Sequence, residues 1–296
     1  MNLVFVINEK NEYARHLGVV MSSILNNTNE FCKFWILYDN LSSESMIKLE
    51  KISKKNNSEI NFIKINREKI KSLPIDERSY IDLVTYARLL APEILKDEDK
   101  ALYLDCDLVV LKDIKELYGL EFNGKSLVAV TDGERDQNRG KKRLDLKEED
   151  SYFNAGVLLM NLEKLRENNK FQKAVEFAAT TDKVLELNDQ DALNAVLYDD
   201  FREGGKSWNY THGNSEELRL KKSEVGIIHY TGSIKPWDAR CINKYRREYL
   251  RYLKLTPWEG YPLDNQSLFN SLMREVTMLK LYSRSFRHSI KKMLKR

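Results

Sequence analysis

Two aspartates separated by one residue stand in the middle of a strongly apolar stretch, Ala101–Leu111 (ALYLDCDLVVL). A run this rich in leucine and valine predicts a strand buried on both faces. Side chains two residues apart on a regular strand point to the same side, so Asp105 and Asp107 are expected to lie together. Two neighbouring carboxylates favour a shared proton or a bound cation, and a hard divalent ion would relieve their repulsion. The alternative is a strand end where both carboxylates are solvated or paired with lysine or arginine.

A histidine at the end of another apolar run could complete such a metal site. His229 lies in the run Val225–Tyr230, and α/β sheets bind ligands at the carboxyl ends of their strands. Neutral imidazole is a borderline ligand that Mn²⁺ accepts, although a lone histidine in this position can equally be structural. Gly232 and Lys235 follow, and an open backbone turn with a lysine suits a phosphate. An ordinary surface turn explains these two residues as well.

Two short polar motifs could recognise a sugar. The tripeptide Asn154–Gly156 (NAG) enters an apolar run, where small residues let a ligand approach the backbone and an amide can donate to a hydroxyl. Tight strand packing is the alternative. The tripeptide Asp189–Asp191 (DQD) opens a helical pattern, and a carboxylate beside an amide suits bidentate binding of sugar hydroxyls. A helix cap explains Asp189 almost equally well.

The composition excludes several classes of protein. With 42% hydrophobic and 32% charged residues and few glycines and prolines, the 296-residue chain is typical of a globular protein. Three widely spaced cysteines provide neither a disulfide framework nor a CxxC zinc site. No apolar stretch has the length of a membrane-spanning helix, and the first residues lack the basic region of a signal peptide. We therefore expect a cytoplasmic protein.

The net charge of +4 is unevenly distributed. From residue 270 onward eight basic residues stand against one acidic residue, so the tail carries +7 and residues 1–269 carry −3. A slightly acidic body argues against nucleic acid as a partner. The basic residues of the tail are Arg274, Lys280, Arg284, Arg287, Lys291, Lys292, Lys295 and Arg296.

The elements that must position these residues begin with an alternation of strand and helix patterns. This β-α-β-α-β order predicts the opening of a doubly wound sheet. No GxGxxG follows the first strand, so a dinucleotide site of the usual kind is not indicated. The expected strands are Leu3–Ile7, Phe34–Tyr38 and Glu59–Ile65, and the expected helices are Asn11–Leu25 and one beginning at Ser42–Ser43.

The middle of the chain is expected to add further strands and helices. A helix at Thr85–Leu95 would deliver Arg88 close to the aspartate pair. The segment Gly133–Asp150 is polar and without periodicity, which predicts a loop, either a lid over a site or a surface insertion. The other expected elements are strands at Ser126–Thr131, Phe153–Met160 and Val225–Tyr230, a helical turn at Ile114–Leu117, and helices at Leu162–Thr180, Asp189–Tyr198 and Ala239–Leu255.

Prolines and a glycine cluster at Thr256–Pro262, which predicts a boundary between a main domain, residues 1–255, and an extension, residues 256–296. Beyond it, apolar residues recur three and four apart from Phe269 to Met293, with basic residues between them, which predicts an amphipathic helix. Such a helix suits an anionic membrane surface. The alternative is a helix that packs on the body with a solvated basic face.

Five blocks of sequence, in this order, resemble glycosyltransferase family 8. They are VFVIN, TYARLLAPEIL leading into LYLDCDLVV, SYFNAGVLLMNL, LNDQDALN and IIHYTGSIKPW, and they extend from Met1 to about Arg251. The resemblance implies a single Rossmann-like GT-A fold with a mixed central sheet and a helical C-terminal extension. It also implies a retaining enzyme that moves galactose or glucose from a UDP-sugar to a saccharide, lipid-linked or glycoprotein acceptor, with Mn²⁺ or alternatively Mg²⁺.

The resemblance assigns roles to individual residues on the phosphate side of the site. Asp105, Asp107 and His229 match the metal ligands of the family. Lys235 and Gly232 match its diphosphate contacts. Arg88 matches an arginine that reaches the donor sugar and phosphate.

Other matched residues belong to the sugar and the reaction centre. Asn154, Ala155, Asp189 and Gln190 match the donor-sugar and reaction-centre set, and Asp132 a carboxylate near the sugar hydroxyls or the acceptor. The resemblance places Gln190 at the position where a nucleophile is expected in the family. A side-chain amide is a poor nucleophile. Retention then favours attack on the sugar from the leaving-group side, with the leaving phosphate accepting the proton of the acceptor.

The uridine side contains one departure from the family. Val6, Asn8 and Tyr13 fall where the family holds the uridine, but Asn8 stands where many members have aspartate. An amide can meet one edge group of uracil but cannot accept at both of its oxygens. The central residue of the DxD motif, Cys106, suits packing or a ribose contact rather than metal binding.

Two other functions remain as alternatives. LDCDLV also fits the nucleophile motif of haloacid-dehalogenase-type phosphatases, although that motif usually follows the first strand of a chain, and here at least three strands precede it. A catalytically inactive sugar-nucleotide-binding protein would keep the pocket. The presence of Asp107, Gln190 and Lys235 argues against this second alternative.

Overall fold

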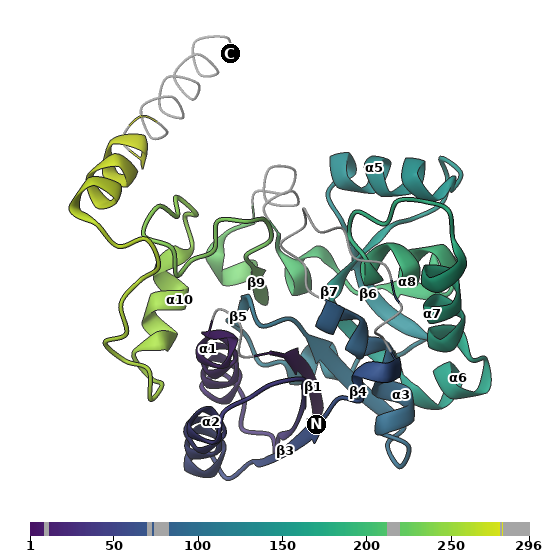
Figure 1. Ribbon diagram of the computed structural model, residues 1–296, viewed down its shortest axis with the longest axis horizontal. Coiled ribbons are helices and arrows are strands. Elements are labelled where there is room, and N and C mark those ends of the chain that lie inside the picture. The colour runs from purple at the N-terminus through teal and green to yellow at the C-terminus, as the bar shows by residue number, and fades with distance from the viewer. Residues whose placement is uncertain (9–11, 70–72, 74–82, 212–219, 279, 281–296) are drawn as a thin grey trace.

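The computed structural model describes residues 1–8, 12–69, 73, 83–211, 220–278 and 280. Its centre is a seven-stranded sheet with the order β3-β2-β1-β4-β7-β6-β8 (Figure 1). Strand β7 is antiparallel to both of its neighbours and the other pairs are parallel, so the sheet is mixed, as predicted. The strands are β1 Asn2–Ile7, β2 Lys33–Tyr38, β3 Glu59–Lys64, β4 Lys100–Leu104, β6 Leu127–Thr131, β7 Phe153–Asn161 and β8 Phe201–Glu203.

Side chains of the central strands alternate between two hydrophobic cores, one on each face of the sheet. In β1, Leu3 and Phe5 belong to one core and Val4 to the other, and in β4 Leu102 and Tyr103 divide in the same way. The alternation follows from the two-residue period of a strand and explains why these runs are apolar throughout. The first core includes residues of α1 Tyr13–Leu25, α2 Ser43–Lys55, α4 Lys115–Tyr118 and α10 Arg246–Leu253, and the second those of α3 Ala91–Ile94, α6 Leu162–Glu167, α7 Lys170–Thr180 and α8 Asp189–Leu197.

The apolar stretch around the aspartate pair is not one strand, contrary to the prediction. Strand β4 ends at Leu104, and β5 (Leu108–Val110) pairs antiparallel with β9 (Ile227–His229) in a separate two-stranded sheet. The break places Asp105 and Asp107 in the bend between β4 and β5, where the N–H of Asp105 still donates to the carbonyl of Gly156 and the carbonyl of Asp107 accepts from the N–H of Tyr230, both at 2.9 Å. The bend brings the two carboxylates to Arg88, His229 and Lys235 rather than into an apolar layer, where an unpaired charge would be costly.

Several predicted helices are shorter or divided. The pattern Leu162–Thr180 forms α6 and α7, because Asn169 has a φ of 50° that a continuous right-handed helix cannot contain. The predicted helix Thr85–Leu95 is a 3₁₀ helix, η3 (Leu83–Leu90), followed by the single turn of α3. Only Arg246–Leu253 of Ala239–Leu255 is α-helical. The described residues also contain the 3₁₀ turns η2 Arg67–Lys69, η4 Lys206–Asn209 and η5 Lys222–Glu224.

The segment Gly133–Asp150 contains a helix rather than a loop, which corrects the prediction. Helix α5 spans Glu134–Leu144, and of its residues only Gly140 and Leu144 are buried. A helix with so few apolar contacts has no hydrophobic stripe in its sequence. Its first turn is acidic and its last turn basic, which suits the helix dipole.

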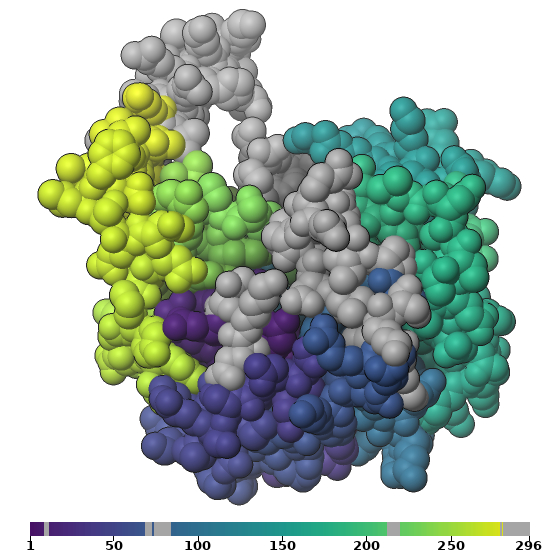
Figure 2. Space-filling view, in the orientation of Figure 1, coloured from purple at the N-terminus to yellow at the C-terminus, as the bar shows by residue number. Residues whose placement is uncertain are grey.

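The C-terminal part of the chain first packs on the body and then leaves it. Trp258 is buried, and its ring packs against Gly18 of α1. Residues 268–278 are helical, as the amphipathic pattern predicts, and this helix extends away from the body (Figures 1 and 2). The predicted continuation of the helix to Met293 lies outside the described residues. Within the part of the chain that the structure describes, no helix is both long and apolar enough to cross a lipid bilayer.

Candidate active site

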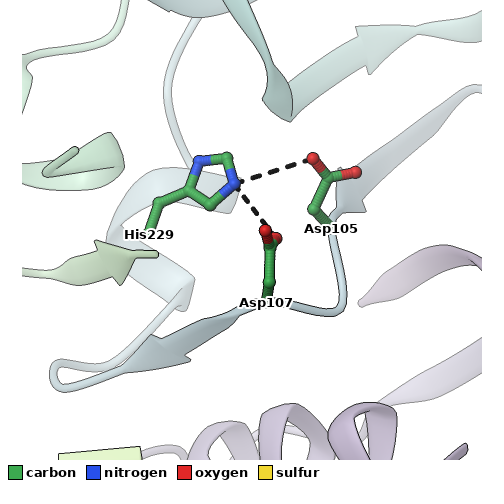
Figure 3. A group of neighbouring side chains, drawn as sticks. All are labelled: Asp105, Asp107 and His229. Carbon is green, nitrogen blue, oxygen red and sulfur yellow. Dashed lines mark hydrogen bonds and ion pairs between the residues drawn. The ribbon is translucent and has the colours of Figure 1, made fainter. Parts of the chain in front are cut away.

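Three predicted metal ligands converge at the end of the central strands (Figure 3). The Nε2 atom of His229 lies 3.1 Å from an Oδ atom of Asp107 and 3.7 Å from one of Asp105. One ligand atom from each of the three residues falls within 4.8 Å of the others. Strand pairing enforces this arrangement, because Leu108, next to the aspartate pair, is in register with His229. Two carboxylates and an imidazole in this geometry fit a divalent cation.

The imidazole of His229 is oriented by an asparagine that the sequence did not identify. Nδ1 of His229 lies 2.9 Å from Oδ1 of Asn209, so a proton on Nδ1 donates to that oxygen and Nε2 faces the carboxylates. The side-chain amide of Asn209 in turn donates to Oδ1 of Asn154 at 2.9 Å. Metal-ligating histidines usually have such a partner on the second ring nitrogen, which fixes the tautomer.

Positive charge balances the carboxylate pair. Nζ of Lys235 donates to Asp107 at 2.6 Å and to the carbonyl of Tyr230 at 2.9 Å. Burial acts to raise the pKa of Asp107, but Lys235 and His229 outweigh it and hold this pKa well below its usual range. Burial acts to lower the pKa of His229, but Asp107 raises it above the ordinary value. Lys235 and the imidazole of His229 therefore compensate the negative charge of Asp107.

Arg88 connects the metal cluster to the DQD motif. Its Nη2 lies 3.2 Å from Asp105, its Nε lies 2.7 Å from Asp189, and its Nη1 donates to the carbonyl of Ala155 at 2.6 Å. The guanidinium also lies over the ring of Tyr103, whose hydroxyl donates to Asp105 at 2.6 Å. Arg88 is buried, so these contacts fix the carboxylate of Asp105 from behind.

Gln190 is held in one orientation by three partners. Its Oε1 accepts from the backbone N–H of Ala155 at 2.9 Å, and its Nε2 donates to Asp132 at 3.1 Å and to the hydroxyl of Tyr152 at 3.2 Å. Asp132 also lies 3.5 Å from the side-chain amide of Asn154. Burial raises the pKa of Asp132 to about 6. The predicted reaction-centre residues therefore form one connected hydrogen-bonded group.

A buried carboxylate behind Gln190 organises this group. Asp191 accepts from Tyr152 at 2.6 Å, from Nη2 of Arg143 at 2.8 Å and from the backbone N–H of Leu187 at 3.0 Å. Arg143 belongs to α5, so Asp191 fastens that helix to the start of α8. The sequence motif contains Asp191, but only as a residue of the first helical turn.

The predicted uridine residues lie on the first strand and helix. Cys106 turns away from the metal ligands, and its thiol lies 3.7 Å from the carbonyl of Val6. Tyr13 opens α1, and its ring meets that of Trp237 edge-on, with the centroids 6.0 Å apart. Asn8 follows the end of β1.

One of the predicted diphosphate residues has an unusual backbone conformation. Gly232 has a φ of 90°, the left-handed region that favours glycine. A turn of this kind exposes backbone groups to a ligand, as the sequence analysis expected of this residue.

The predicted site residues gather at one edge of the sheet for a topological reason. Strands β1, β4 and β6 run in the same direction and end next to Asn8, Asp105 and Asp132, whereas β7 runs oppositely and begins next to Asn154. Sequence reasoning missed supporting residues such as Asn209 and Tyr152. They contact His229 and Gln190 from other parts of the chain. Tyr152 stands close to the Asn154–Gly156 motif in the sequence, which is a weak signal. Asn209 stands near no motif, so the sequence gives no sign of its role.

Comparison with known proteins identifies the family. The family model for glycosyl transferase family 8 matches residues 2–241. General stress protein A of Bacillus subtilis (strain 168) is 30% identical over 274 residues, which cover 86% of this chain and 94% of that protein. Lipopolysaccharide 1,2-glucosyltransferase of Escherichia coli (strain K12) is 30% identical over 269 residues, which cover 86% of this chain and 79% of that protein.

A solved structure gives the same result for the fold. The galactosyltransferase LgtC in complex with donor and acceptor sugar analogs has a TM-score of 0.79 and 26% sequence identity, covering 87% of this chain and 96% of that one. The predicted GT-A-type α/β fold is thus confirmed, and the match favours glycosyl transfer over the phosphatase alternative. The chain, matched over residues 2–241, belongs to glycosyl transferase family 8.

Proposed function

We propose that the protein is a retaining hexosyltransferase that uses a UDP-sugar as donor and Mn²⁺ as cofactor. The observation that carries the proposal is the convergence of Asp105, Asp107 and His229 with Lys235 beside them. This arrangement places a divalent-cation site and a lysine ammonium together, as a nucleoside diphosphate requires. Relatives are a glucosyltransferase and a galactosyltransferase by name, which supports glucose or galactose as the transferred sugar and a saccharide or glycoconjugate as the acceptor.

The chain's own residues would prepare the sugar for attack. A bound ion would offset the negative charge that accumulates on the departing diphosphate. Lys235, which lies beside the proposed metal ligands, would bind a phosphate oxygen. The carboxylate of Asp132 would accept a hydrogen bond from a sugar hydroxyl, and the amide of Asn154 would donate one. The amide of Gln190, held by Asp132, would line the reacting face of the sugar.

Retention is best served by attack from the leaving-group side. The bond from the anomeric carbon to the phosphate oxygen breaks, the bond from the acceptor oxygen forms on the same face, and the acceptor's proton passes to the leaving phosphate. Gln190 is an amide with all of its polar atoms engaged, and Asp189 is buried against Arg88, so neither is placed as a nucleophile. A covalent sugar adduct on Gln190 or Asp189, detected by mass spectrometry, would contradict this route.

A donor screen tests the proposed function. The chain is incubated with UDP-galactose, UDP-glucose and their N-acetyl forms, with Mn²⁺ or Mg²⁺, and UDP release is measured. We expect release with one hexose donor in Mn²⁺, and a loss on the order of 10²-fold or more in Asp107→Asn. Glu50→Gln, which removes one partner of an exposed ion pair on α2, is the matched control. No UDP release with any donor, despite nucleotide binding, would instead indicate a binding protein.

We also propose that the C-terminal helix attaches the enzyme to the cytoplasmic face of an anionic membrane. The side chains of Leu268, Phe269, Leu272, Met273 and Val276 recur at helical spacing and are 42–79% exposed. Basic residues intervene and follow, giving residues 270–296 a charge of +7. An exposed apolar stripe in a segment with this net charge fits the interface of a lipid bilayer that contains anionic headgroups.

Co-sedimentation with vesicles tests the membrane proposal. We expect the full chain to pellet with vesicles containing phosphatidylserine or phosphatidylglycerol, and a chain that ends at Ser267 to stay in the supernatant. Binding should weaken as salt rises, because the basic residues are screened. The double variant Phe269→Ser/Leu272→Ser keeps the charge and tests the apolar stripe. Equal pelleting of the full and shortened chains would rule the idea out.

A further inference from the structure

The segment that follows α10 folds back onto the loop that carries Lys235. The backbone N–H of Asp264 donates to the carbonyl of Trp237, and the N–H of Ala239 donates to the carbonyl of Asp264, both at 2.9 Å. The side-chain amide of Asn265 adds a bond to Asp238 at 2.8 Å. Residues 237–239 are thus paired with a segment that the sequence places beyond the main domain.

A buried arginine of α1 holds this segment from the other side. Arg15 is almost fully buried, and its Nη1 donates to the carbonyl of Pro262 while its Nη2 donates to Asp264, both at 3.2 Å. The guanidinium carbon also lies 5.3 Å from the ring centroid of Tyr261. Because Arg15 belongs to a helix of the core, residues 261–264 are fixed to the rigid part of the molecule.

The loop has two further supports near Lys235. The ring of Trp237 stacks on His16 with centroids 3.5 Å apart, and Nε of Arg246 donates to the carbonyl of Pro236 at 2.9 Å. The backbone N–H of Asp238 donates to the carbonyl of Lys235 at 3.0 Å. These contacts hold the main chain just after Lys235. Arg15 adds a further support, because it holds Asp264, which is paired with residues 237–239.

We propose that Arg15 and Asp264 are positioning residues for Lys235. They form a clamp, defined here as Arg15, Asp264 and the paired residues 237–239, that aims the lysine at the donor diphosphate. The inference rests on the proposed function for the role of Lys235. It follows that residues 262–265 belong to the catalytic unit, and that the separable tail begins after Asn265.

Two shortened chains and one substitution test the clamp. A chain ending at Ser267 retains it, and a chain ending at Tyr261 loses Asp264 and Asn265. We expect the first to keep the wild-type KM for the UDP-sugar with a soluble acceptor, and the second to raise that KM on the order of tenfold with a smaller change in kcat. Asp264→Ala should move KM in the same direction, which keeps the test available if the shorter chain does not fold. Unchanged donor KM in both would overturn the proposal.

Combining substitutions separates positioning from general stability. In a Lys235→Met background, Asp264→Ala should raise the donor KM no further, because the clamp acts through that lysine. If Asp264→Ala raises the donor KM equally with Lys235 and with Lys235→Met, the clamp does not act through Lys235.

Hydrogen exchange tests the clamp without relying on activity. The backbone amide of Ala239, which donates to the carbonyl of Asp264, should exchange faster in the chain ending at Tyr261 than in the chain ending at Ser267. Equal exchange there would refute the clamp itself. Absence of UDP-sugar turnover in the full chain would instead refute the proposed function, so the two failures are distinguishable.

Discussion

Gly156→Ala is expected to weaken metal binding and sugar transfer strongly in a chain that still folds. A Cβ atom at Gly156 would lie 2.3 Å from Cε1 of His229 and 2.7 Å from an Oδ atom of Asp105, closer than non-bonded atoms can approach. Both side chains must therefore move, and both are predicted metal ligands. Moving His229 also breaks its hydrogen bond to Asn209, which fixes the ring.

Metal affinity measures this effect directly. We expect Mn²⁺ binding, followed by calorimetry, to weaken on the order of 10–100-fold, and UDP release to fall at least as far. Gly204→Ala is the matched control, because its Cβ would crowd Val128 at 2.9 Å and touches no ligand. That control should lower the melting temperature and leave metal affinity unchanged. Wild-type Mn²⁺ affinity in Gly156→Ala would show that the three residues do not form the metal site.

The second large effect is expected for Asp191→Asn. The substitution removes the buried charged partner of Arg143 and leaves the guanidinium with only the exposed Glu186, 3.2 Å from its Nη1, so the loss of unfolding free energy should fall below the value of about 3–5 kcal/mol for a fully broken buried pair. It also disturbs Tyr152, whose hydroxyl bridges Asp191 and Gln190. We therefore expect lower stability in urea and a fall in kcat on the order of tenfold, since Gln190 is no longer fixed at the reacting face.

Two companion variants separate the structural and catalytic parts of this prediction. Arg143→Met releases α5 but leaves the bond from Tyr152 to Asp191, so stability should fall while kcat changes little. Tyr152→Phe removes the bridge and keeps the ring, so kcat should fall with a smaller loss of stability. If Asp191→Asn destabilises the chain yet keeps a normal kcat below its melting temperature, the carboxylate serves the fold alone.

The first half of the fold could be predicted because each element there has a clear period. Strands such as Leu3–Ile7 are apolar on both faces, since their side chains divide between two cores. The bend at Asp105–Asp107 could not be placed, because the runs on either side are equally apolar and one long strand fits the same pattern. The separate pairing of β5 with β9 decides it, and that pairing joins residues that are 117 to 121 positions apart in the sequence.

Helix α5 shows the opposite difficulty. It buries only Gly140 and Leu144, so it has no apolar stripe from which a helix could be inferred. A weaker signal was present, since Glu134 and Asp136 open the segment and basic residues close it, in accord with the helix dipole. The break between α6 and α7 depends on the left-handed conformation of Asn169, which asparagine permits but does not require.

Short motifs supplied the candidate metal ligands and the resemblance supplied their expected roles. The structure brings these residues together, while their roles stay predictions. The supporting residues could not be inferred, because Asn209 and Arg15 act on partners distant in sequence and carry no motif. Their roles arise only when the tertiary structure places them beside His229 and Asp264.

The pairing of Leu108 with His229 has a consequence for synthesis of the chain on the ribosome. The aspartate pair emerges early, but the third ligand leaves the exit tunnel more than a hundred residues later, after most of the sheet has been translated. A nascent chain arrested before that point holds a carboxylate pair with no imidazole opposite. In the proposed metal site, tight binding of the ion would therefore require a chain translated beyond His229, and a shorter polypeptide would bind the ion weakly.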